Sequence, residues 1–347
     1  MSHPDPSASV IVPVLNASRT LPACLEALSR LRPRPFEVLL IDNGSTDGSR
    51  DILQAFVQRH PSWVRLLEEG RRGASASRNA GAWRAHGDIL VFTDADCAPR
   101  TDWLEQLLPP FCDPSVGAVA GRIEATSSGS TLQLFSALYT LQSSPEPSRH
   151  TQWTPTSGGF PTANLAVRRP VMERLRGFDE SIVIYGEDYD LCARIYHEGY
   201  SIAYRPGAVV VHDHRTSVCA VVRQAFGFGR SHAYLLRRHT RARLWLEWPQ
   251  RAIASVPSPL RGWVNPVSAD KKLLCFLLAG FLWRPLWIFL PLYAVWLGWD
   301  ARRRAVCHGR AVSLVTIIQL AGLHLIKASA MTAGRWMGSL RYGVMCL

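Results

Sequence analysis

The stretch that decides the fold is Gly87-Asp88-Ile89-Leu90-Val91-Phe92-Thr93-Asp94-Ala95-Asp96-Cys97. Its apolar run, Ile89 to Phe92, has the length and composition of a buried strand. The run ends at two carboxylates, Asp94 and Asp96, and Pro99 then interrupts the extended chain. We therefore expect both acids just beyond the carboxyl end of a strand, where open α/β sheets bind their ligands.

The pair of acids favours a metal site. Neighbouring carboxylates repel each other, and a hard divalent cation that also holds a phosphate removes the repulsion. The alternative is structural, with Asp96 capping a helix expected at 102–111 and Asp94 as a solvated turn residue. The motif alone leaves both interpretations open.

Strands and helices alternate on both sides of this stretch. Strands are expected at 10–14, 36–41, 64–67, 89–92, 116–122, 160–168, 200–204 and 208–211. Helices are expected at 21–31, 52–57, 102–111, 132–141 and 186–199, and a loop at 70–81 leads into a helix that ends at His86. Strands separated by single helices predict an α/β fold with a parallel, doubly wound sheet.

Composition narrows the function classes. The chain has 347 residues, of which 47% are hydrophobic, so it can bury a sizeable core. Its net charge of +12 implies an anionic partner, such as nucleic acid, a membrane surface or a phosphorylated substrate. The eight cysteines form no CxxC pair and are expected to be reduced thiols in the cytosol. Residues 1–9 lack the apolar core of a signal peptide.

Polar residues follow several predicted strands, at 13–16, 42–47, 78–79 and 94–96. In a parallel sheet such segments converge on one edge, and their residue types fit a nucleoside diphosphate. The candidate donor-binding residues are Pro13, Asn16, Asp42, Asn43, Ser45, Arg78, Asn79 and Asp94. The alternatives are that 42–48 only forms a turn and a helix cap, and that Arg78 is a surface charge. Dinucleotide and P-loop sites lack their glycine fingerprints here.

Further candidates lie downstream. Glu187 and Asp188 open a predicted helix, where they are either dipole partners or a base that deprotonates an acceptor hydroxyl. His212 and His214 end a strand, and two residues at this spacing point to the same side. We expect His212 to join Asp94 and Asp96 as a metal ligand, the alternative being a pair of solvated histidines.

Five motifs occur in a fixed order along the chain. They are Val10-Ile11-Val12-Pro13-Val14-Leu15-Asn16, Ile41-Asp42-Asn43-Gly44-Ser45-Thr46-Asp47, Ala76-Ser77-Arg78-Asn79-Ala80-Gly81, Thr93-Asp94-Ala95-Asp96 and Gly186-Glu187-Asp188-Tyr189-Asp190-Leu191. In these motifs, over about residues 8 to 215, the chain resembles the family 2 glycosyltransferases, which are inverting enzymes with the GT-A fold.

The resemblance implies a GT-A type doubly wound mixed sheet, a nucleotide-diphosphate-sugar donor and a Mn²⁺ or Mg²⁺ ion. By similarity, Asp42 would bind the base or ribose, Asp96 the metal, and Asp188 would act as base. The more common family turn has an acid after its asparagine, where this chain has Ala17. The Gln-x-x-Arg-Trp motif of processive synthases is absent, which favours transfer of one sugar at a time.

Three functions remain to be compared. The leading one is transfer of a sugar to a hydroxyl of a lipid-linked or cell-surface glycan acceptor. A nucleotidyltransferase acting on a sugar phosphate would typically carry a glycine-rich basic loop after the first strand, which 13–18 lacks. A lectin-like or scaffold protein that lost turnover would not need the intact acids Asp94, Asp96 and Asp188. Nucleic acid is a poor partner, because the arginines lie beside apolar blocks rather than aromatic stacking platforms.

Beyond residue 215 the composition predicts contact with a membrane. The composition of Arg223 to Arg251 is typical of a basic amphipathic stretch that lies on anionic lipid. Residues 256–268 are rich in proline and are expected to form a linker. Leu273 to Trp299 is apolar except for Arg284, which Pro285 follows, and Val312 to Ile326 is a second apolar block.

A single span through the first block would place the arginines at 302–304 and 310 outside, against the positive-inside rule. We therefore expect a helical hairpin broken at Arg284-Pro285, re-entrant or interfacial, the alternative being two ordinary spans. The expected layout is a catalytic domain at 1–215 (donor half about 8–122, acceptor half about 123–215), basic helices and linker at 216–270, and a hydrophobic membrane-associated region at 271–347. The expected location is the cytoplasmic face of the cell membrane.

Overall fold

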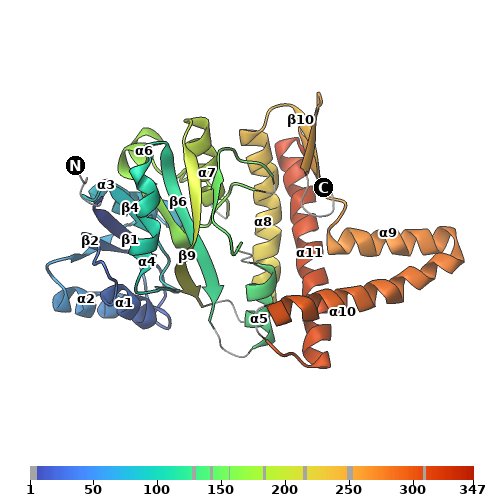
Figure 1. The fold of residues 1–347 in the computed structure, drawn as a ribbon, viewed down its shortest axis with the longest axis horizontal. Helices are drawn as coiled ribbons and strands as arrows, with labels where there is room; N and C mark the ends of the chain where they lie inside the picture. The colour runs from blue at the N-terminus through green and yellow to red at the C-terminus, as the bar shows by residue number, and fades with distance from the viewer. Residues whose placement is uncertain are drawn as a thin grey trace. The chain divides into compact units, whose positions relative to one another are not determined.

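The chain forms two compact units, one of residues 1–126 and 143–213 and the other of 127–142 and 214–347. They are seen in a computed structural model that describes residues 6–126, 130–140, 144–155, 157–182, 185–213, 217–247, 253–307 and 310–347. Figure 1 shows the ribbon coloured along the chain. The segment 127–142, which we expected in the acceptor half of the catalytic domain, belongs to the second unit.

A mixed sheet with helices packed against it forms the first unit. Its strands are β1 (Ala8–Val14), β2 (Glu37–Asp42), β3 (Val64–Glu68), β4 (Ile89–Phe92), β5 (Cys97–Pro99), β6 (Val116–Ala125), β7 (Ser148–His150), β8 (Leu165–Arg168) and β9 (Ser201–His212). The order is β3-β2-β1-β4-β8-β6-β9-β5, with β7 beside β9. Strands β3, β2, β1 and β4 are parallel, and β8 runs antiparallel to both of its neighbours. The α/β fold with a doubly wound sheet is confirmed, and the sheet is mixed.

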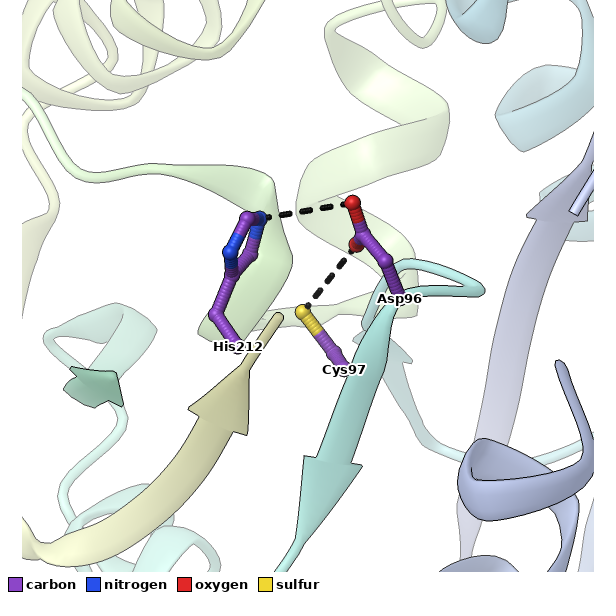
Figure 2. Close-up of side chains that lie close together, drawn as sticks. All are labelled: Asp96, Cys97 and His212. Atoms are coloured by element: carbon purple, nitrogen blue, oxygen red, sulfur yellow. Dashed lines mark hydrogen bonds and ion pairs between the residues drawn. The ribbon is translucent and has the colours of Figure 1, made fainter. Parts of the chain in front are cut away.

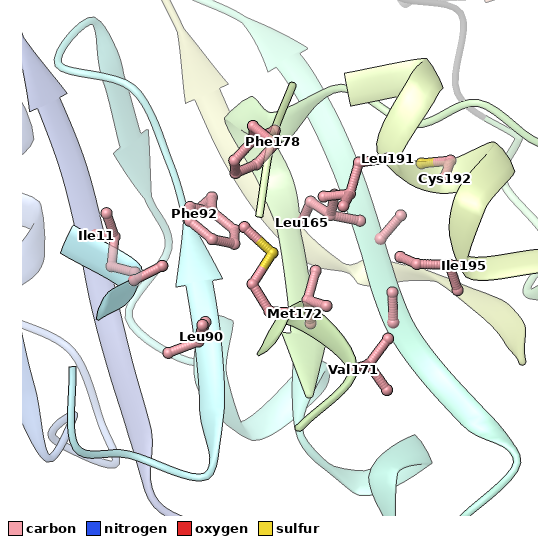
Figure 3. Close-up of a cluster of buried hydrophobic side chains, with 14 of the residues drawn as sticks. Ile11, Leu90, Phe92, Leu165, Val171, Met172, Phe178, Leu191, Cys192 and Ile195 are labelled. Atoms are coloured by element: carbon pink, nitrogen blue, oxygen red, sulfur yellow. The ribbon is translucent and has the colours of Figure 1, made fainter. Parts of the chain in front are cut away.

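The helices of this unit connect the strands as the alternation predicts. They are α1 (Leu21–Ser29), α2 (Ser49–Arg59), α3 (Ala74–Arg84), α4 (Trp103–Leu107), α6 (Arg169–Arg174) and α7 (Glu187–His197), with 3₁₀ turns η1 (Pro109–Cys112) and η2 (Thr162–Asn164). The core between sheet and helices is apolar (Figure 3). Phe92 of the central strand meets Phe178 edge-on at 5.2 Å, beside Met172 and Leu165.

Several boundaries differ from the prediction. The segment 70–81 is not a loop throughout, because α3 begins at Ala74. Its small residues have modest helix propensity, but the helix lies flat on the sheet, and a Cβ at Gly81 would come within 2.6 Å of Ile11 Cγ2. The helix expected at 102–111 is α4 followed by η1, because Pro109 and Pro110 cannot continue an α-helix. The strands expected at 200–204 and 208–211 are one strand, β9, with an irregular register against β6.

The second unit combines helices with a small sheet. Its helices are α5 (Thr131–Tyr139), α8 (Val218–His239), α9 (Ala269–Leu282), α10 (Phe289–Cys307) and α11 (Leu314–Tyr342), and η4 (Arg284–Ile288) joins α9 to α10. The four-stranded sheet has the order β11-β10-β12-β13, made of β10 (Arg243–Glu247), β11 (Ile253–Pro257), β12 (Gly262–Val264) and β13 (Met345–Cys346). The segment 256–268 is therefore not a simple linker, because β12 and the end of β11 pair with strand β10.

Helices α8 and α11 lie side by side and approach each other closely (Figure 1). A Cβ atom at Gly334 would overlap the backbone oxygen of Phe226, and one at Gly229 would overlap that of Met331. At Gly338 a Cβ atom would come within 2.7 Å of the Ala233 Cβ atom of α8. Much of the apolar face of α8, which we expected to lie on lipid, is therefore covered by α11.

The apolar block 273–299 is broken where the sequence predicts. Helix α9 ends at Leu282, the 3₁₀ turn η4 contains Arg284 and Pro285, and α10 follows. Phe276 of α9 stacks on Phe289 at 5.6 Å, so the two helices form a hairpin. In the described part of the chain, α11 is the one helix long and apolar enough to cross a membrane by length and composition alone.

Candidate active site

Hydrogen bonds join the turn after β1 to the turn after β2 at the carboxyl edge of the parallel strands. The Asn16 N–H donates to Ser45 Oγ at 3.1 Å, and Asn16 Oδ1 accepts the Thr46 N–H at 2.8 Å. Asn16 has a φ of 50°, a left-handed conformation that asparagine tolerates. Pro13 lies one residue before the end of β1. The predicted residues Pro13, Asn16 and Ser45 therefore lie at one edge of the sheet.

Asp42 and Asn43 are both buried at the end of β2, but they have different surroundings. Asp42 Oδ1 accepts the Ser45 N–H at 3.0 Å, which fixes the turn. The Asn43 amide donates to two backbone oxygens in the loop after β3, at 2.7 and 2.8 Å, and accepts the Gly73 N–H at 3.0 Å. The side chain of Asn43 thus shapes the loop that leads into α3.

Arg78 lies on α3 and connects two acidic motifs. Its guanidinium donates to Asp94 Oδ1 at 2.8 Å and to Glu187 Oε1 at 3.1 Å, and the residue is 4% exposed. Burial opposes the charge of Arg78, but these carboxylates outweigh it and hold its pKa above the ordinary value. The interpretation of Arg78 as a surface charge is wrong, because the side chain is buried between two acids.

Asn79, the next residue of α3, holds a turn of the chain in place. Its Nδ2 donates to the Phe178 backbone oxygen at 3.0 Å and to Glu180 Oε1 at 2.9 Å, while its Oδ1 accepts the Phe178 N–H at 2.8 Å. All of these partners belong to the segment between α6 and α7. The amide of Asn79 therefore holds this segment in place, and its role in donor binding stays a prediction.

Asp96, Cys97 and His212 come together because β5 pairs antiparallel with the end of β9, placing Cys97 opposite His212 (Figure 2). The Asp96 carboxylate lies 3.5 Å from His212 Nε2, and one ligand atom from each of the three residues lies within 4.8 Å of the others. Asp94 is not in this group, since its carboxylate bonds to Arg78. His214 lies outside the described residues.

The donor set suits a divalent cation. Burial and the neighbouring Asp94 raise the pKa of Asp96, while His212 opposes the shift, so positive charge at this point is favourable. Burial also raises the pKa of Cys97, and its thiol donates to Asp96 Oδ1 at 3.6 Å. In the structure without an ion, the Cys97 thiol thus serves as a hydrogen-bond donor to Asp96. A carboxylate and an imidazole remain as ligands, which fits Mn²⁺ and, through the carboxylate, Mg²⁺.

The first two residues of helix α7, Glu187 and Asp188, are acids with different surroundings. Gly186 at its N-cap has a φ of 104°, which turns the chain into the helix. Glu187 is held by Arg78, whereas the Asp188 Oδ1 accepts the Tyr189 N–H at 2.9 Å. Burial and the Glu187 carboxylate raise the pKa of Asp188 to about 7. Asp188 is therefore suited to take up a proton near neutral pH.

Comparison with known proteins places the chain in a family. The model of glycosyl transferase family 2 matches residues 9–176. Glycosyltransferase AglE of Haloferax volcanii is 31% identical over 219 residues, which cover 62% of this chain and 69% of the relative. The chain belongs to glycosyltransferase family 2.

Two further proteins define the extent of the likeness. The pre-mycofactocin glycosyltransferase of Mycobacterium tuberculosis is 33% identical over 248 residues, covering 69% of this chain and 51% of the relative, so the chain spans about half of that protein. The mannosyltransferase PcManGT of Pyrobaculum calidifontis, solved with GDP-Man and Mn²⁺, is 22% identical with a TM-score of 0.56. That likeness covers 94% of this chain and 87% of the other, and it shows the fold, which is of the GT-A type.

Sequence reasoning missed two residues of this family 2 site. Cys97 directly follows Asp96, and its position next to a predicted ligand was a signal that we did not use. Asn164 gave no signal at all. It is 1% exposed, accepts the Trp103 indole N–H at 2.8 Å, and donates to the backbone oxygens of Arg122 and Ala208 at 2.8 and 2.9 Å. Asn164 thereby joins α4 and β6 to β9, the strand that ends at the candidate ligand His212.

Proposed function

We propose that this chain is an inverting, non-processive glycosyltransferase that moves a sugar from a nucleotide-diphosphate donor to an acceptor hydroxyl. One observation carries the proposal. Arg78 bridges Asp94, on the loop of the candidate metal ligand Asp96, and Glu187, the neighbour of the candidate base Asp188. The residues that would bind the leaving diphosphate and the residue that would deprotonate the acceptor are thus connected through Arg78.

The nucleotide-sugar donor would bind at the carboxyl edge of the sheet. Asp42 would bind the base or ribose, with Pro13, Asn16 and Ser45 around it, while Asn43 and Asn79 position the loops. Asp96 and His212 would hold Mn²⁺ or Mg²⁺, with Asp94 alongside. Such an ion, when bound, neutralises the diphosphate that leaves. PcManGT, the structural neighbour, was solved with GDP-Man and Mn²⁺, which supports a donor and metal of this kind.

Asp188 would be the base that activates the acceptor hydroxyl. Its carboxylate takes the proton of the acceptor hydroxyl as that oxygen attacks the anomeric carbon and the bond to the diphosphate breaks. A single displacement of this kind inverts the anomeric configuration. Glu187 is paired with Arg78, so its part is to raise the proton affinity of Asp188. The sugar ends on the acceptor oxygen and the proton on Asp188.

The acceptor and the location belong to the same proposal. We propose a lipid-linked or cell-surface glycan acceptor at the cytoplasmic face of the cell membrane, where the second unit attaches the enzyme. Helices α9 and α10 and the turn between them expose large apolar side chains, among them Phe281, Trp283 and Val295, which soluble surfaces rarely gather. The net charge of +12 favours an anionic membrane surface.

The first test is donor binding and turnover. Purified full chain is screened by thermal shift against nucleotide sugars with Mn²⁺, since a bound donor stabilises by mass action. Donor turnover is then compared with Asp96→Ala and with EDTA. We expect Asp96→Ala to abolish transfer while the melting temperature of the free protein changes little, because Asp96 lies in a loop. Turnover that survives both Asp96→Ala and EDTA would contradict the metal site, and NMR showing a retained anomeric configuration would contradict inversion.

A further inference from the structure

The turn at 175–178, between α6 and α7, is held from two sides. Helix α3 holds one side, because Asn79 Oδ1 accepts the Phe178 N–H at 2.8 Å and Asn79 Nδ2 donates to the Phe178 backbone oxygen at 3.0 Å. Gly177 has a φ of 75°, and a Cβ atom there would come within 2.4 Å of Asn79 Oδ1. The turn therefore lies against α3 at a distance that only glycine at 177 allows.

Helix α7 holds the other side of this turn through Arg194. The Arg194 Nη1 donates to the backbone oxygens of Leu175 and Gly177, both at 2.9 Å. Its Nε donates to Asp190 Oδ2 at 2.7 Å, and the Asp190 side chain is fully buried. The fixed fork of a guanidinium can reach a carboxylate and two carbonyl oxygens at once. Arg194 thus joins α7 to the backbone of the turn.

Helices α3 and α7 are therefore connected twice. The direct connection is the ion pair of Arg78 with Glu187, at 3.1 Å. The second runs from the amide of the next residue of α3, through the turn at 175–178, to Arg194. On α7 the two connections lie about two helical turns apart, so a shift of the helix along its axis would break at least one of them. Asp188 directly follows Glu187, and both connections therefore fix its distance from Arg78.

We propose that Arg194 is a positioning residue for sugar transfer, because it holds α7 against the turn at 175–178 and so keeps the Asp188 carboxylate where it can deprotonate an acceptor hydroxyl. This role rests on the proposed function, in which Asp188 is the base. Arg194 lies between one and two helical turns beyond Asp188 and contacts groups of the protein, so its influence on the reaction passes through the helix.

The kinetic test is Arg194→Lys in the purified full chain, with Mn²⁺ and the nucleotide sugar that gives the largest thermal shift. Lysine keeps a positive charge beside Asp190 but lacks the fork that holds both backbone oxygens. We expect kcat to fall about ten- to a hundredfold with donor affinity unchanged, since a small misplacement of a reacting group is costly. The charges of Glu187 and Arg78, which also act on Asp188, remain in this variant.

The pH profile of the same variant distinguishes positioning from a general loss of activity. Burial is the largest cause of the raised pKa of Asp188, and a base that is no longer held in place gains water. The pH at which the rate rises should therefore move down in Arg194→Lys, from the value near 7 expected for the wild type. A loss of rate with an unshifted profile would overturn the inference.

A readout without substrate separates this inference from the proposed function. In the wild-type background, Asp188→Asn should raise the melting temperature more at pH 8 than at pH 5, because the buried carboxyl resists ionisation. In the Arg194→Lys background this difference should shrink, since a hydrated Asp188 ionises more easily. A purely structural role of Arg194 would lower all the melting temperatures and leave the difference unchanged, which would also overturn the inference.

Arg174→Gln is the matched control. Arg174 of α6 forms an exposed ion pair with Glu198, the C-cap residue of α7, at 3.9 Å, and such pairs contribute little. This variant should keep the wild-type rate profile and melting difference, and the changes expected for Arg194→Lys would contradict the inference if they appeared here too.

A second variant covers the case in which Arg194→Lys does not fold. Asp190→Asn combined with Arg194→Gln removes both buried charges together, which proteins tolerate better than the loss of one partner, and it also removes the fork. The same downward shift of the profile and the same smaller melting difference are expected. If the wild type turns over no nucleotide sugar, the proposed function is wrong, and the melting difference still decides whether Arg194 holds Asp188 in place.

Discussion

The four carboxylates of the active site differ in their surroundings, not in their chemistry. Asp94 and Glu187 are both paired with the buried Arg78, so each has its negative charge compensated inside the protein. Asp96 faces a histidine and has a raised pKa, and Asp188 has no such pair and titrates near neutrality. We propose that each acid has its own task, and that the pairing of Arg78 with Asp94 and Glu187 sets Asp96 and Asp188 apart for metal binding and proton transfer.

Asp188 should impose a pH dependence on transfer. With its pKa raised to about 7, the base is protonated at pH 6 and ionised at pH 8, so the rate should rise across that interval. Asp188→Asn should lose about 10²–10⁴-fold in rate, keep donor affinity and lose this rise. Rates of transfer from pH 5 to 9 in both proteins check this, and near-normal turnover in Asp188→Asn would refute the role.

The same shift predicts an effect on stability. A carboxyl group whose pKa is higher in the folded state favours folding below its unfolded pKa, near 4, and loses that contribution as the pH rises to about 7. Asp188→Asn should therefore raise the melting temperature at pH 8 relative to the wild type by more than it does at pH 5.

Arg78 should act through the acids that it holds. Its charge lowers the pKa of Asp188, against the larger effect of burial, so Arg78→Gln should move the pH–rate profile to higher pH and lower the rate at neutrality. Lysine cannot bridge two carboxylates as a guanidinium does, so Arg78→Lys should also be impaired. The exposed Arg72→Gln is the control. An unshifted profile in Arg78→Gln would show that the bridge does not tune the base.

At the scale of residues, the sequence could place acids at the ends of strands and helices but could not show their distant partners. Asp94, Asp96 and Asp188 were placed by their positions at strand and helix ends, which local patterns reveal. The partners of Arg78 and Asn79 could not be read in this way, because Glu187 and Glu180 lie about a hundred residues downstream. From the sequence alone, a side chain that binds a ligand cannot be distinguished from one that holds a distant loop in place.

Among the elements, the strands were predicted best. The buried strands of the sheet are continuous apolar runs, and burial on both faces demands them. Helix α3 was missed over residues 74–81, most of its length, because its small residues resemble a loop and only packing on β1 and β2 makes it helical. The sheet of the second unit was missed because strands of two to five residues, one ending in Pro257, become stable only through pairing with distant partners.

The contact between α8 and α11 makes a prediction about glycine. Gly334→Ala should destabilise the second unit by about 1–3 kcal/mol, because the new methyl group meets backbone, which cannot move aside as a side chain can. Gly322→Ala, on the same helix with open space around it, should be neutral or stabilising by up to about 1 kcal/mol. Thermal melts of both variants in detergent give the comparison, and equal effects would disprove close packing as the cause.

For the whole molecule, the break at Arg284-Pro285 makes a topological prediction. Helices α9 and α10, joined by a 3₁₀ turn, form a hairpin, so on the proposed membrane attachment we expect the chain to return to the side from which it came and Arg302, Arg303 and Arg304 to stay in the cytosol. Cys307, exposed at the end of α10, should therefore be protected from a membrane-impermeant thiol reagent added to intact cells, and react after permeabilisation.

The labelling experiment needs a variant in which Cys307 is the one cysteine that the thiol reagent can reach. Replacing the other exposed cysteines, Cys112, Cys219 and Cys275, by serine leaves Cys307 as the accessible thiol. The same chain with Cys307→Ser is the blank. Modification of Cys307 from outside intact cells would make the hairpin wrong and two ordinary spans right.

The close contact of α8 with α11 also limits the depth at which either helix can lie in a bilayer. Val221 packs with Leu320 and Leu323, and the glycine contacts continue to Gly338, so most of α11 runs beside α8. Helix α8 has 22 residues and carries four arginines, at 223, 230, 237 and 238. An arginine held at the middle of the hydrocarbon costs about 2.5–3.5 kcal/mol or more. Crossing the bilayer with α11 would take α8 along. If the second unit attaches to a membrane as proposed, we therefore expect this pair at the level of the lipid headgroups and the hairpin of α9 and α10 as the part that enters the hydrocarbon.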